Sequence, residues 1–358
     1  MTNSDTSDLY NNQKNIVFVI TKSEVGGAQT WVSQLKFILE EKHNIFLITS
    51  ETGWLTDYFE PEKVKIVPGL VSMLKPGAIF KISSALKEFN ADLVISNSAT
   101  AGLYSRLAKI FYRHKHIYVS HGWSCIYNGG RFEKIFCLIE RFLSLLTNKV
   151  LCVSINDQYN ATHVIGINAD KTVVIRNSIN PMEKKNFINK KFKILFVGRM
   201  SYPKRPDLLA EAAVYFPDVV FDFVGGGPLL SELKKKYQSS PNIRFLGEIG
   251  SFKNFKDYEL FVLASESEGL PMSALEAATA GLPLLLSDVG GCNELILESI
   301  TGDKNGLLFN NKLSELVSQI REIINNYELF YYAANDISDK FDINKHKDYY
   351  YQLIDNLC

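Results

Sequence analysis

Several features that would assign a chain to a broad class are missing from this sequence of 358 residues. There is no run of about eighteen uninterrupted apolar residues, so no transmembrane helix is expected. Residues 1–13 are polar and contain no apolar segment of the kind that a signal peptide has, so we expect no secretory signal. Lysine plus arginine and aspartate plus glutamate both number 39, so no net charge would draw the chain to nucleic acid. Affinity for an anionic partner must therefore come from a local patch.

Cysteine is scarce and shows no paired spacing. The five cysteines form no Cys-x-x-Cys pair and no metal-ligand pattern. We therefore expect reduced, buried thiols in a cytoplasmic protein. The composition is 46% hydrophobic and 22% charged, which is typical of a globular protein, and the length predicts two domains.

Apolar segments of strand length alternate with helical patterns through both halves of the chain. Such alternation predicts an α/β protein with mostly parallel sheets covered on both faces. The expected strands lie at residues 15–21, 44–49, 64–67, 92–96, 116–120, 149–153, 193–197, 219–224, 243–246, 260–263, 283–286 and 306–309.

The composition changes at residues 178–191, which are rich in Asn, Pro and Lys and have no strong period. This segment predicts a domain boundary. We expect an N-terminal domain over residues 1–180 and a C-terminal domain over 181–340. Residues 341–358 are expected to form a helix that returns to the first domain.

Residues 265–276 combine a predicted strand end, an acidic turn and a helix start. Glu268 lies in the turn, and Glu276 lies about one turn into the helix. Ligands of open α/β sheets bind at the carboxyl ends of strands, and the N–H groups of a helix start favour anions. Glu276 is suited to accept hydrogen bonds from a vicinal diol such as ribose. The alternative is that both carboxylates are solvated charges that favour the helix start.

Two further strand ends of the second half carry cations and glycines. Arg199 and Lys204 flank the turn after residues 193–197, where a diphosphate is the natural anion. Each could instead be a solvated surface charge. Gly225 and Gly227 follow the next strand and would let a nucleotide approach the backbone, but Leu230 stands where the third glycine of a dinucleotide motif would be.

The first half offers a glycine pair and a histidine at strand ends. Gly26 and Gly27 lie between the first strand and its helix, where they suit either a bound phosphate or a tight turn. His121 directly follows residues 116–120, a position at which parallel sheets place ligands, although a structural role is an alternative. The polar residues 96–98 follow another strand in the same way.

Residues 131–149 form an amphipathic helical pattern. We expect its apolar stripe to pack on the sheet, and docking on a membrane surface is the alternative. A basic and aromatic patch nearby supports that alternative, since such patches bind anionic headgroups; its cationic members are Arg106, Lys109, Arg113, His114 and Lys115.

Taken together, these turns resemble the retaining nucleotide-sugar glycosyltransferases of the GT-B class known as glycosyltransferase family 4. The resemblance covers nearly the whole chain. Its motifs are residues 197–199 with Lys204, residues 222–228, residues 245–247, the Glu-x7-Glu pair of Glu268 and Glu276, and Gly281-x-Pro283, Ser287-Asp288, Gly290-Gly291, Glu294 and Gly306. Two positions depart from the family pattern: Arg205 follows Lys204 where glycine is usual, and Cys292-Asn293 precede Glu294.

The resemblance implies a GT-B fold of two Rossmann-like domains that face each other across a cleft. It also implies roles for the site residues. Arg199 and Lys204 would bind the donor diphosphate and stabilise the charge that builds on it. Glu276 would hold the ribose hydroxyls, and Glu268 would contact the transferred sugar. Sugar and phosphate would also meet backbone N–H groups across Gly269, Leu270, Pro271 and Met272, with Gly225 and Gly227 close to the nucleotide.

In the first half, the resemblance places Gly26 and Gly27 near the phosphate and the acceptor. His121 corresponds to the active-site histidine of the family. Retention at the anomeric carbon could proceed by same-face attack with the leaving phosphate as base, or through a covalent intermediate on Glu268. No metal and no cofactor beyond the nucleoside-diphosphate sugar are expected, because Arg199 and Lys204 can supply positive charge.

The resulting hypothesis is a retaining, metal-independent transfer of a hexose or N-acetylhexosamine. The donor would be a UDP-sugar, and the acceptor a hydroxyl of a polyprenyl-diphosphate-linked saccharide in capsule or lipopolysaccharide synthesis. The enzyme would lie peripherally at the inner face of the cell membrane. The alternatives are a sugar-nucleotide epimerase of the same fold and a catalytically silent subunit that binds sugar nucleotides.

Overall fold

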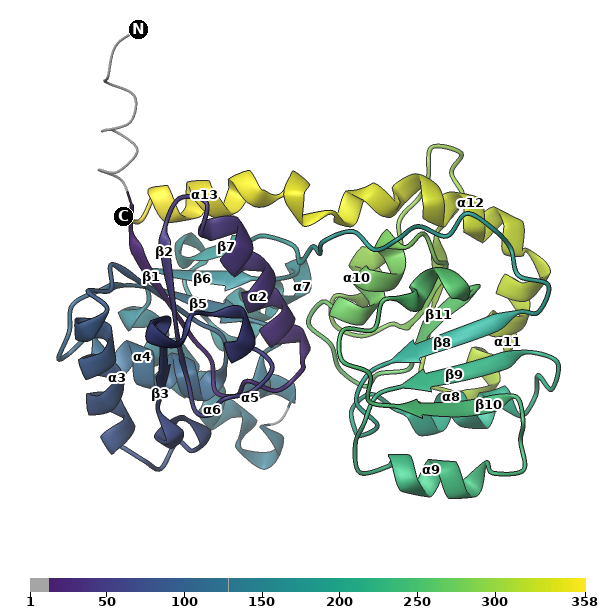
Figure 1. Ribbon diagram of the computed structural model, residues 1–358, viewed down its shortest axis with the longest axis horizontal. Coiled ribbons are helices and arrows are strands. Elements are labelled where there is room, and N and C mark those ends of the chain that lie inside the picture. The colour runs from purple at the N-terminus through teal and green to yellow at the C-terminus, as the bar shows by residue number, and fades with distance from the viewer. Residues whose placement is uncertain (1–12, 128) are drawn as a thin grey trace, which may run out of the picture. The chain divides into compact units, whose positions relative to one another are not determined.

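The computed structural model describes residues 13–127 and 129–358 (Figure 1). Within these residues the chain divides into two compact units. The first unit ends at Arg176 and also includes His346–Cys358, and the second comprises Asn177–Lys345. The sequence had predicted the boundaries after residues 180 and 340.

The first unit contains a seven-stranded parallel sheet with the strand order β3-β2-β1-β4-β5-β6-β7. Its strands are β1 (Asn15–Val19), β2 (Asn44–Thr49), β3 (Val64–Ile66), β4 (Leu93–Ser96), β5 (Lys115–Ser120), β6 (Lys149–Cys152) and β7 (Thr172–Val174). Its helices are α2 (Gly27–Leu39), α3 (Gly77–Glu88), α4 (Ala99–Ala108), α5 (Ser124–Tyr127), α6 (Glu133–Leu143), α7 (Ile155–Tyr159) and α13 (Lys347–Asp355).

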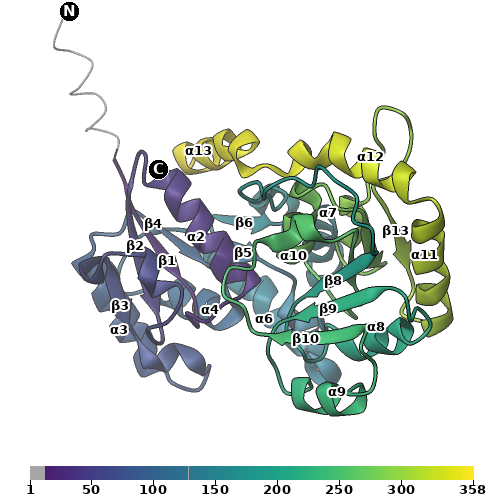
Figure 2. The same cartoon turned by 45° about the vertical axis from the view of Figure 1, so that its right-hand side comes forward.

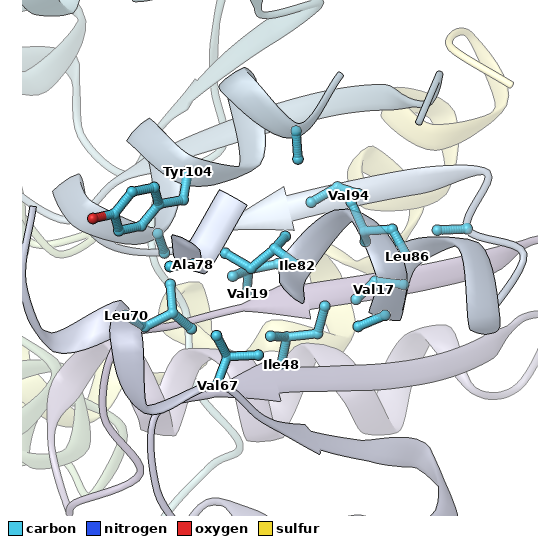
Figure 3. Close-up of a cluster of buried hydrophobic side chains, with 14 of the residues drawn as sticks. Val17, Val19, Ile48, Val67, Leu70, Ala78, Ile82, Leu86, Val94 and Tyr104 are labelled. Atoms are coloured by element: carbon cyan, nitrogen blue, oxygen red, sulfur yellow. The ribbon is translucent and has the colours of Figure 1, made fainter. Parts of the chain in front are cut away.

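Alternate residues of β1 serve opposite faces of this sheet, as the two-residue period of a strand requires. Val17 and Val19 join the cluster that lies under α3 and α4, together with Ile82 and Tyr104 (Figure 3). Phe18 points the other way, and its ring meets Trp31 of α2 with 6.4 Å between the ring centroids.

The helix α13 packs on α2 within the first unit. The Tyr351 hydroxyl donates a hydrogen bond to the Ile38 carbonyl at 2.7 Å. Tyr350 meets Trp31 edge-on at 6.1 Å between centroids. The end of the chain therefore covers a helix close to its beginning.

The second unit contains a six-stranded parallel sheet with the strand order β10-β9-β8-β11-β12-β13, part of which Figure 2 shows as the adjacent strands β8, β9 and β10. The strands are β8 (Lys193–Val197), β9 (Val220–Val224), β10 (Ile243–Gly247), β11 (Leu260–Leu263), β12 (Leu284–Ser287) and β13 (Gly306–Phe309). The helices are α8 (Pro206–Ala213), α9 (Leu230–Lys236), α10 (Met272–Thr279), α11 (Leu313–Asn325) and α12 (Tyr327–Ile337).

Each strand expected from the sequence forms. The sequence analysis did not predict β7, a strand of three residues. None of the helices in the described part of the chain is sufficiently long and apolar to span a membrane.

The interpretation of residues 131–149 as a core helix is wrong. The apolar stripe of α6 faces solvent, with Ile135 56% and Phe142 62% exposed. The inward side instead carries Cys137 and Glu140, and Glu140 forms a 2.7 Å ion pair with the fully buried Arg106 of α4. This buried ion pair orients the helix with its polar side toward the protein.

The basic patch at residues 106–115 is also smaller than the sequence suggested. Arg106 and His114 are buried, and Lys109 is half-buried because its ammonium donates to the Leu146 carbonyl at 2.8 Å. Arg113 and Lys115 remain exposed.

Candidate functional site

The site residues expected in the second unit lie in loops at the carboxyl ends of its strands. Arg199 and Lys204 follow β8, Gly225 and Gly227 follow β9, and Glu268 follows β11. In the sheet β8 and β11 are neighbours, and the connection after β8 leads to β9 on one side while the connection after β11 leads to β12 on the other. The loops after β8 and β11 therefore border the point at which open α/β sheets bind ligands.

An ion pair joins those two loops. The ammonium of Lys204 lies 2.5 Å from Glu268 Oε1, and the Ser265 hydroxyl donates to the same oxygen at 2.5 Å. The two charged side chains are only 19% and 8% exposed. Within the described chain, Glu268 Oε2 accepts no hydrogen bond, and Lys204 uses one of its three N–H groups on Glu268. The pair thus keeps an acceptor and donors available for a polar ligand.

Arg199 is exposed and carries no such partner. Its guanidinium makes no hydrogen bond or ion pair with any residue in the ranges 13–127 and 129–358. A guanidinium whose five N–H donors make no hydrogen bond within the described chain is suited to bind phosphate oxygens.

Arg205 occupies the position at which the resembled family usually has glycine, and its backbone adopts a conformation that favours glycine. Its φ of 48° lies in the left-handed region. The side chain donates to Glu266 at 2.6 Å and to Asp207 at 3.0 Å. Two carboxylates therefore hold a residue whose backbone is strained.

Two substitutions at Arg205 separate the backbone strain from the ion pairs. Both Arg205→Ala and Arg205→Gly remove the side-chain contacts, but only alanine is strained at this φ. We expect the alanine variant to be less stable than the glycine variant by about 1 kcal/mol. Chemical denaturation of both variants measures the difference, and equal stabilities would show that the loop relaxes.

Close backbone packing fixes the loops after β9 and β12. A Cβ atom on Gly225 would lie 1.9 Å from the Gly198 carbonyl oxygen, and one on Gly290 would lie 1.8 Å from that of Glu268. The Gly291 amide donates to the Gly269 carbonyl at 2.8 Å. Any side chain at these two glycines would displace the loop that carries Arg199 or Glu268.

Glu276 lies in the second turn of α10 as a half-buried carboxylate. Burial raises its pKa to about 8. Within the described chain, its carboxylate has no hydrogen bond and no ion pair. At the start of the same helix, Pro271 provides no side-chain cap, so the first N–H groups are available to an anion. A half-buried carboxylate without a partner in the described chain is suited to bind a ligand that donates hydroxyl hydrogens.

In the first unit, His121 has a defined hydrogen-bond partner. The Asn97 amide donates to the Ile95 carbonyl at 3.1 Å, which turns Asn97 Oδ1 toward His121 Nε2, also at 3.1 Å. Nε2 therefore carries the proton and donates. Burial lowers the pKa of His121 to about 4, so the ring is neutral at physiological pH and is a weak base.

A cavity of about 200 Å³ lies between the loops after β1 and β4. These two strands are adjacent in the first sheet, and the connections after them run in opposite directions, so the cavity also lies at a switch point. Thr21 and Ser98 line the cavity with their hydroxyl oxygens 2.6 Å apart, and Asn97 lines it as well. Gly26 and Gly27 begin α2 beside it, and no side chain caps that helix.

Among the residues that the structure describes, no three His, Cys, Asp or Glu side chains are grouped so that they could hold a metal ion.

Comparisons with known proteins identify the family. The family model for glycosyl transferases group 1 matches residues 177–336, and that for glycosyltransferase family 4 matches residues 25–183. The O-antigen biosynthesis glycosyltransferase WbnH of Escherichia coli is 46% identical over 341 residues, which cover 95% of this chain and 99% of the relative. The chain belongs to glycosyltransferase family 4.

A second E. coli relative is more distant from this glycosyltransferase. It is the UDP-Gal:alpha-D-GlcNAc-diphosphoundecaprenol alpha-1,3-galactosyltransferase, 29% identical over 302 residues, with 76% of this chain and 78% of the relative covered.

Solved structures confirm the GT-B fold of the glycosyltransferase. Anabaena HepE in complex with UDP-glucose aligns with a TM-score of 0.82 and 19% identity, covering 96% of this chain and 100% of that chain. The lipopolysaccharide outer core galactosyltransferase WaaB in its apo form aligns with a TM-score of 0.70 and 16% identity, covering 95% and 99%. The chain is thus an α/β protein with two Rossmann-like domains.

Within the second domain of the glycosyltransferase, the structure brings Lys204 and Glu268 into direct contact. Cys292, one of the departures from the family pattern, is fully buried, and its burial and the negative charge of Glu268 raise the pKa of its thiol. The roles assigned to the site residues remain predictions.

Two polar residues of the site were not assigned a role from the sequence alone. Ser265 shares an oxygen of Glu268 with Lys204, and Asn97 orients His121. The available signal was their position, because each follows a buried strand directly or within two residues.

Proposed function

We propose that this glycosyltransferase moves a hexose or N-acetylhexosamine from a UDP-sugar to a hydroxyl of a lipid-linked saccharide in surface-polysaccharide synthesis. The observation that carries the proposal is the group of strand-end side chains in the second domain. Among the residues that the structure describes, Arg199 and Glu276 have no hydrogen-bond or ion-pair partner, and Lys204 and Glu268 are paired. The two cations are complementary to a diphosphate, Glu268 to a transferred sugar, and Glu276 to a ribose diol.

The chemistry assigned to the cations is charge stabilisation. When the glycosidic bond breaks, negative charge develops on the leaving diphosphate, and fixed cations at that position lower the barrier. Arg199 and Lys204 would bind the phosphate oxygens without needing a metal ion. Transfer that continues at full rate in the presence of a chelator is the expected result.

Retention by same-face attack is the mechanism that we favour. Its proton acceptor would be the leaving phosphate, since His121, with a pKa of about 4, is too weak a base for the task. The covalent route would use Glu268, whose Oε1 already accepts hydrogen bonds from Lys204 and Ser265. The name of the galactosyltransferase relative gives UDP-Gal as donor and an alpha-1,3 linkage. Because common UDP-hexoses carry the α anomer, this supports retention.

The acceptor proposal rests on the relatives. One relative is named for O-antigen biosynthesis, and another for a GlcNAc-diphosphoundecaprenol acceptor. A polyprenyl-linked acceptor resides in a membrane, so we propose that the enzyme binds peripherally at the inner face of the cell membrane. In the first domain, the cavity beside Thr21, Asn97 and Ser98 presents the hydroxyl and amide groups that bind sugar hydroxyls.

A donor screen followed by analysis of the product tests this proposal. Among nucleoside diphosphates and their sugars, we expect uridine compounds to raise the melting temperature most. The new linkage, analysed by proton NMR, should have the anomeric configuration of the donor. Preference for another base, or an inverted linkage, would contradict the corresponding part of the proposal.

A further inference from the structure

The helix α6 presents a large apolar surface that nothing in the described chain covers. The α6 apolar face, as we call it, consists of large side chains from α6 and its two flanking turns, each between 38% and 70% exposed: Phe132, Ile135, Phe136, Leu138, Ile139, Phe142, Leu145 and Leu146. Their spacing of three and four residues places them on one side of the helix. Scattered exposed apolar residues are common on soluble proteins, but a contiguous face of this kind marks an interaction site.

Polar contacts fix this orientation of the helix. Glu140, on the opposite side, pairs with the buried Arg106, whose Nε also donates to the Thr147 hydroxyl at 2.9 Å. Lys171 closes the C-terminal end by donating to the carbonyls of Ser144 and Thr147 at 2.8 and 3.0 Å. If the helix rotated to bury its apolar side, these contacts would break and a buried arginine would lose its partner.

The apolar surface continues onto the end of α4. The hydrogen bond from Lys109 to the Leu146 carbonyl brings that end beside the α6 apolar face. There Ile110 is 71% exposed and Phe111 is 55% exposed. The ring of Phe111 meets that of Phe80 of α3, with 4.9 Å between centroids.

The part of the chain that carries this surface is rich in cations. Between residues 106 and 149 the chain has eight lysines and arginines but only two glutamates, although the whole chain has equal numbers of both charges. One of the glutamates, Glu140, is already neutralised by Arg106. Five of the cations are exposed: Arg113, Lys115, Arg131, Lys134 and Arg141. Burial lowers the pKa of Lys109, and the positive charges of Lys171 and Lys115 lower it further.

We infer that the α6 apolar face inserts into the interface of an anionic lipid bilayer. An apolar helix side bordered by lysine and arginine suits this partner, because the apolar side chains enter the acyl boundary while the cations meet the headgroups. A second copy of the chain is a poorer partner, since two such surfaces would bring their exposed cations together. The helix lies in the interface plane and does not cross it.

This inference deepens the proposed function by assigning its membrane contact to one element. In the first domain, α6 begins at Glu133, after β5 and α5, and His121 lies in the loop that directly follows the carboxyl end of β5. A helix anchored there would hold this end of the domain at the membrane surface, where a lipid-linked acceptor resides. Vesicle binding requires neither donor nor acceptor, so its result does not depend on transfer.

Flotation of the full chain with vesicles tests the inference. We expect binding to vesicles of phosphatidylethanolamine and phosphatidylglycerol, and weaker binding to neutral phosphatidylcholine vesicles or in high salt. The double variant Ile139→Gln with Phe142→Gln should bind at least about tenfold more weakly, because both side chains belong to the inserted surface. The matched control, Val214→Gln with Tyr215→Gln, changes two similarly exposed apolar residues of the second domain and should bind like the wild type.

Two further measurements keep the result interpretable. Circular dichroism should show that both double variants are folded, and transfer to a water-soluble acceptor should be unchanged in both. If the wild type did not transfer sugar to the water-soluble acceptor, this result would count against the proposed function but not against the docking surface. The inference is overturned if the wild type does not bind anionic vesicles, or if the α6 variant binds them as the wild type does. It is also overturned if ultracentrifugation shows that the wild type is a dimer, and the only effect of the α6 substitutions is to convert this dimer to a monomer.

Discussion

Replacing Arg199 with alanine is expected to lower kcat by roughly 10²- to 10³-fold, the usual effect of removing a group that stabilises transition-state charge. Arg199 is exposed and has no partner within the described chain, so its contribution is reserved for a ligand. For the same reason, the free energy of unfolding should change by no more than about 0.5 kcal/mol. Steady-state kinetics with the preferred donor, combined with chemical denaturation, measures both quantities.

Lys235→Ala is the matched control for this substitution. Lys235 is an exposed cation of the same domain, but it lies near the C-terminal end of α9, away from the strand-end loops. We expect its kcat to remain at the wild-type value. An Arg199 variant with full activity would contradict the assignment of the donor diphosphate to the loop after β8.

Replacing Glu276 with glutamine is expected to weaken UDP binding about 10- to 100-fold at pH 8, because hydrogen bonds to a charged group contribute about 1.5–3 kcal/mol. Ribose hydroxyls stabilise the ionised carboxylate, so a bound nucleotide should lower the pKa of Glu276 below its free value of about 8. The affinity of the wild type should therefore rise as the pH increases toward 8 and then level off. Glutamine removes this rise, and titration calorimetry at several pH values measures it.

The same substitution should stabilise the free protein. Glu276 has a raised pKa in the folded state, about 8 against 4.5 in its ordinary range, so the unfolded chain ionises first as the pH rises. Between pH 4.5 and 8 the wild type consequently loses stability that the glutamine variant keeps. Because the carboxyl is partly exposed, we expect a gain of about 1–3 kcal/mol at pH 8, or roughly 2–10 °C in Tm, and little difference at pH 4.5.

Glu232→Gln is the matched control for Glu276. Glu232 is an exposed glutamate of α9 in the same domain. Its replacement should change neither the UDP affinity nor the pH dependence of Tm. If the Glu276 variant bound UDP as tightly as the wild type, the ribose assignment would be wrong, whatever the effect on stability.

The parallel sheets could be predicted because their strands are short apolar runs. Such runs are typical of strands buried on both faces, and their alternation with helices implies parallel pairing. The strand-end positions of Arg199, Lys204 and Glu268 follow directly from that pattern. Their contacts do not, because Lys204 and Glu268 are 64 positions apart in the chain and meet only when β8 and β11 lie side by side.

The orientation of α6 could not be predicted, for a different reason. The period of its apolar residues predicts a two-sided helix, but it does not say which side faces the protein. That choice depends on the contact between Glu140 and Arg106, which are 34 positions apart in the chain. From the sequence, Arg106 was predicted to belong to a surface patch. Arg205 is similar, because its left-handed backbone is held by Glu266, a residue from another loop.

The central claim is that this protein transfers a sugar from a nucleotide donor to an acceptor. Mass spectrometry of a reaction with purified protein, a UDP-hexose and a polyprenyl-diphosphate-linked GlcNAc acceptor tests it directly. The account predicts an acceptor heavier by one hexose residue and the release of one UDP for each acceptor modified. An acceptor of unchanged mass would contradict it, whether the donor were converted to another sugar nucleotide or bound without turnover.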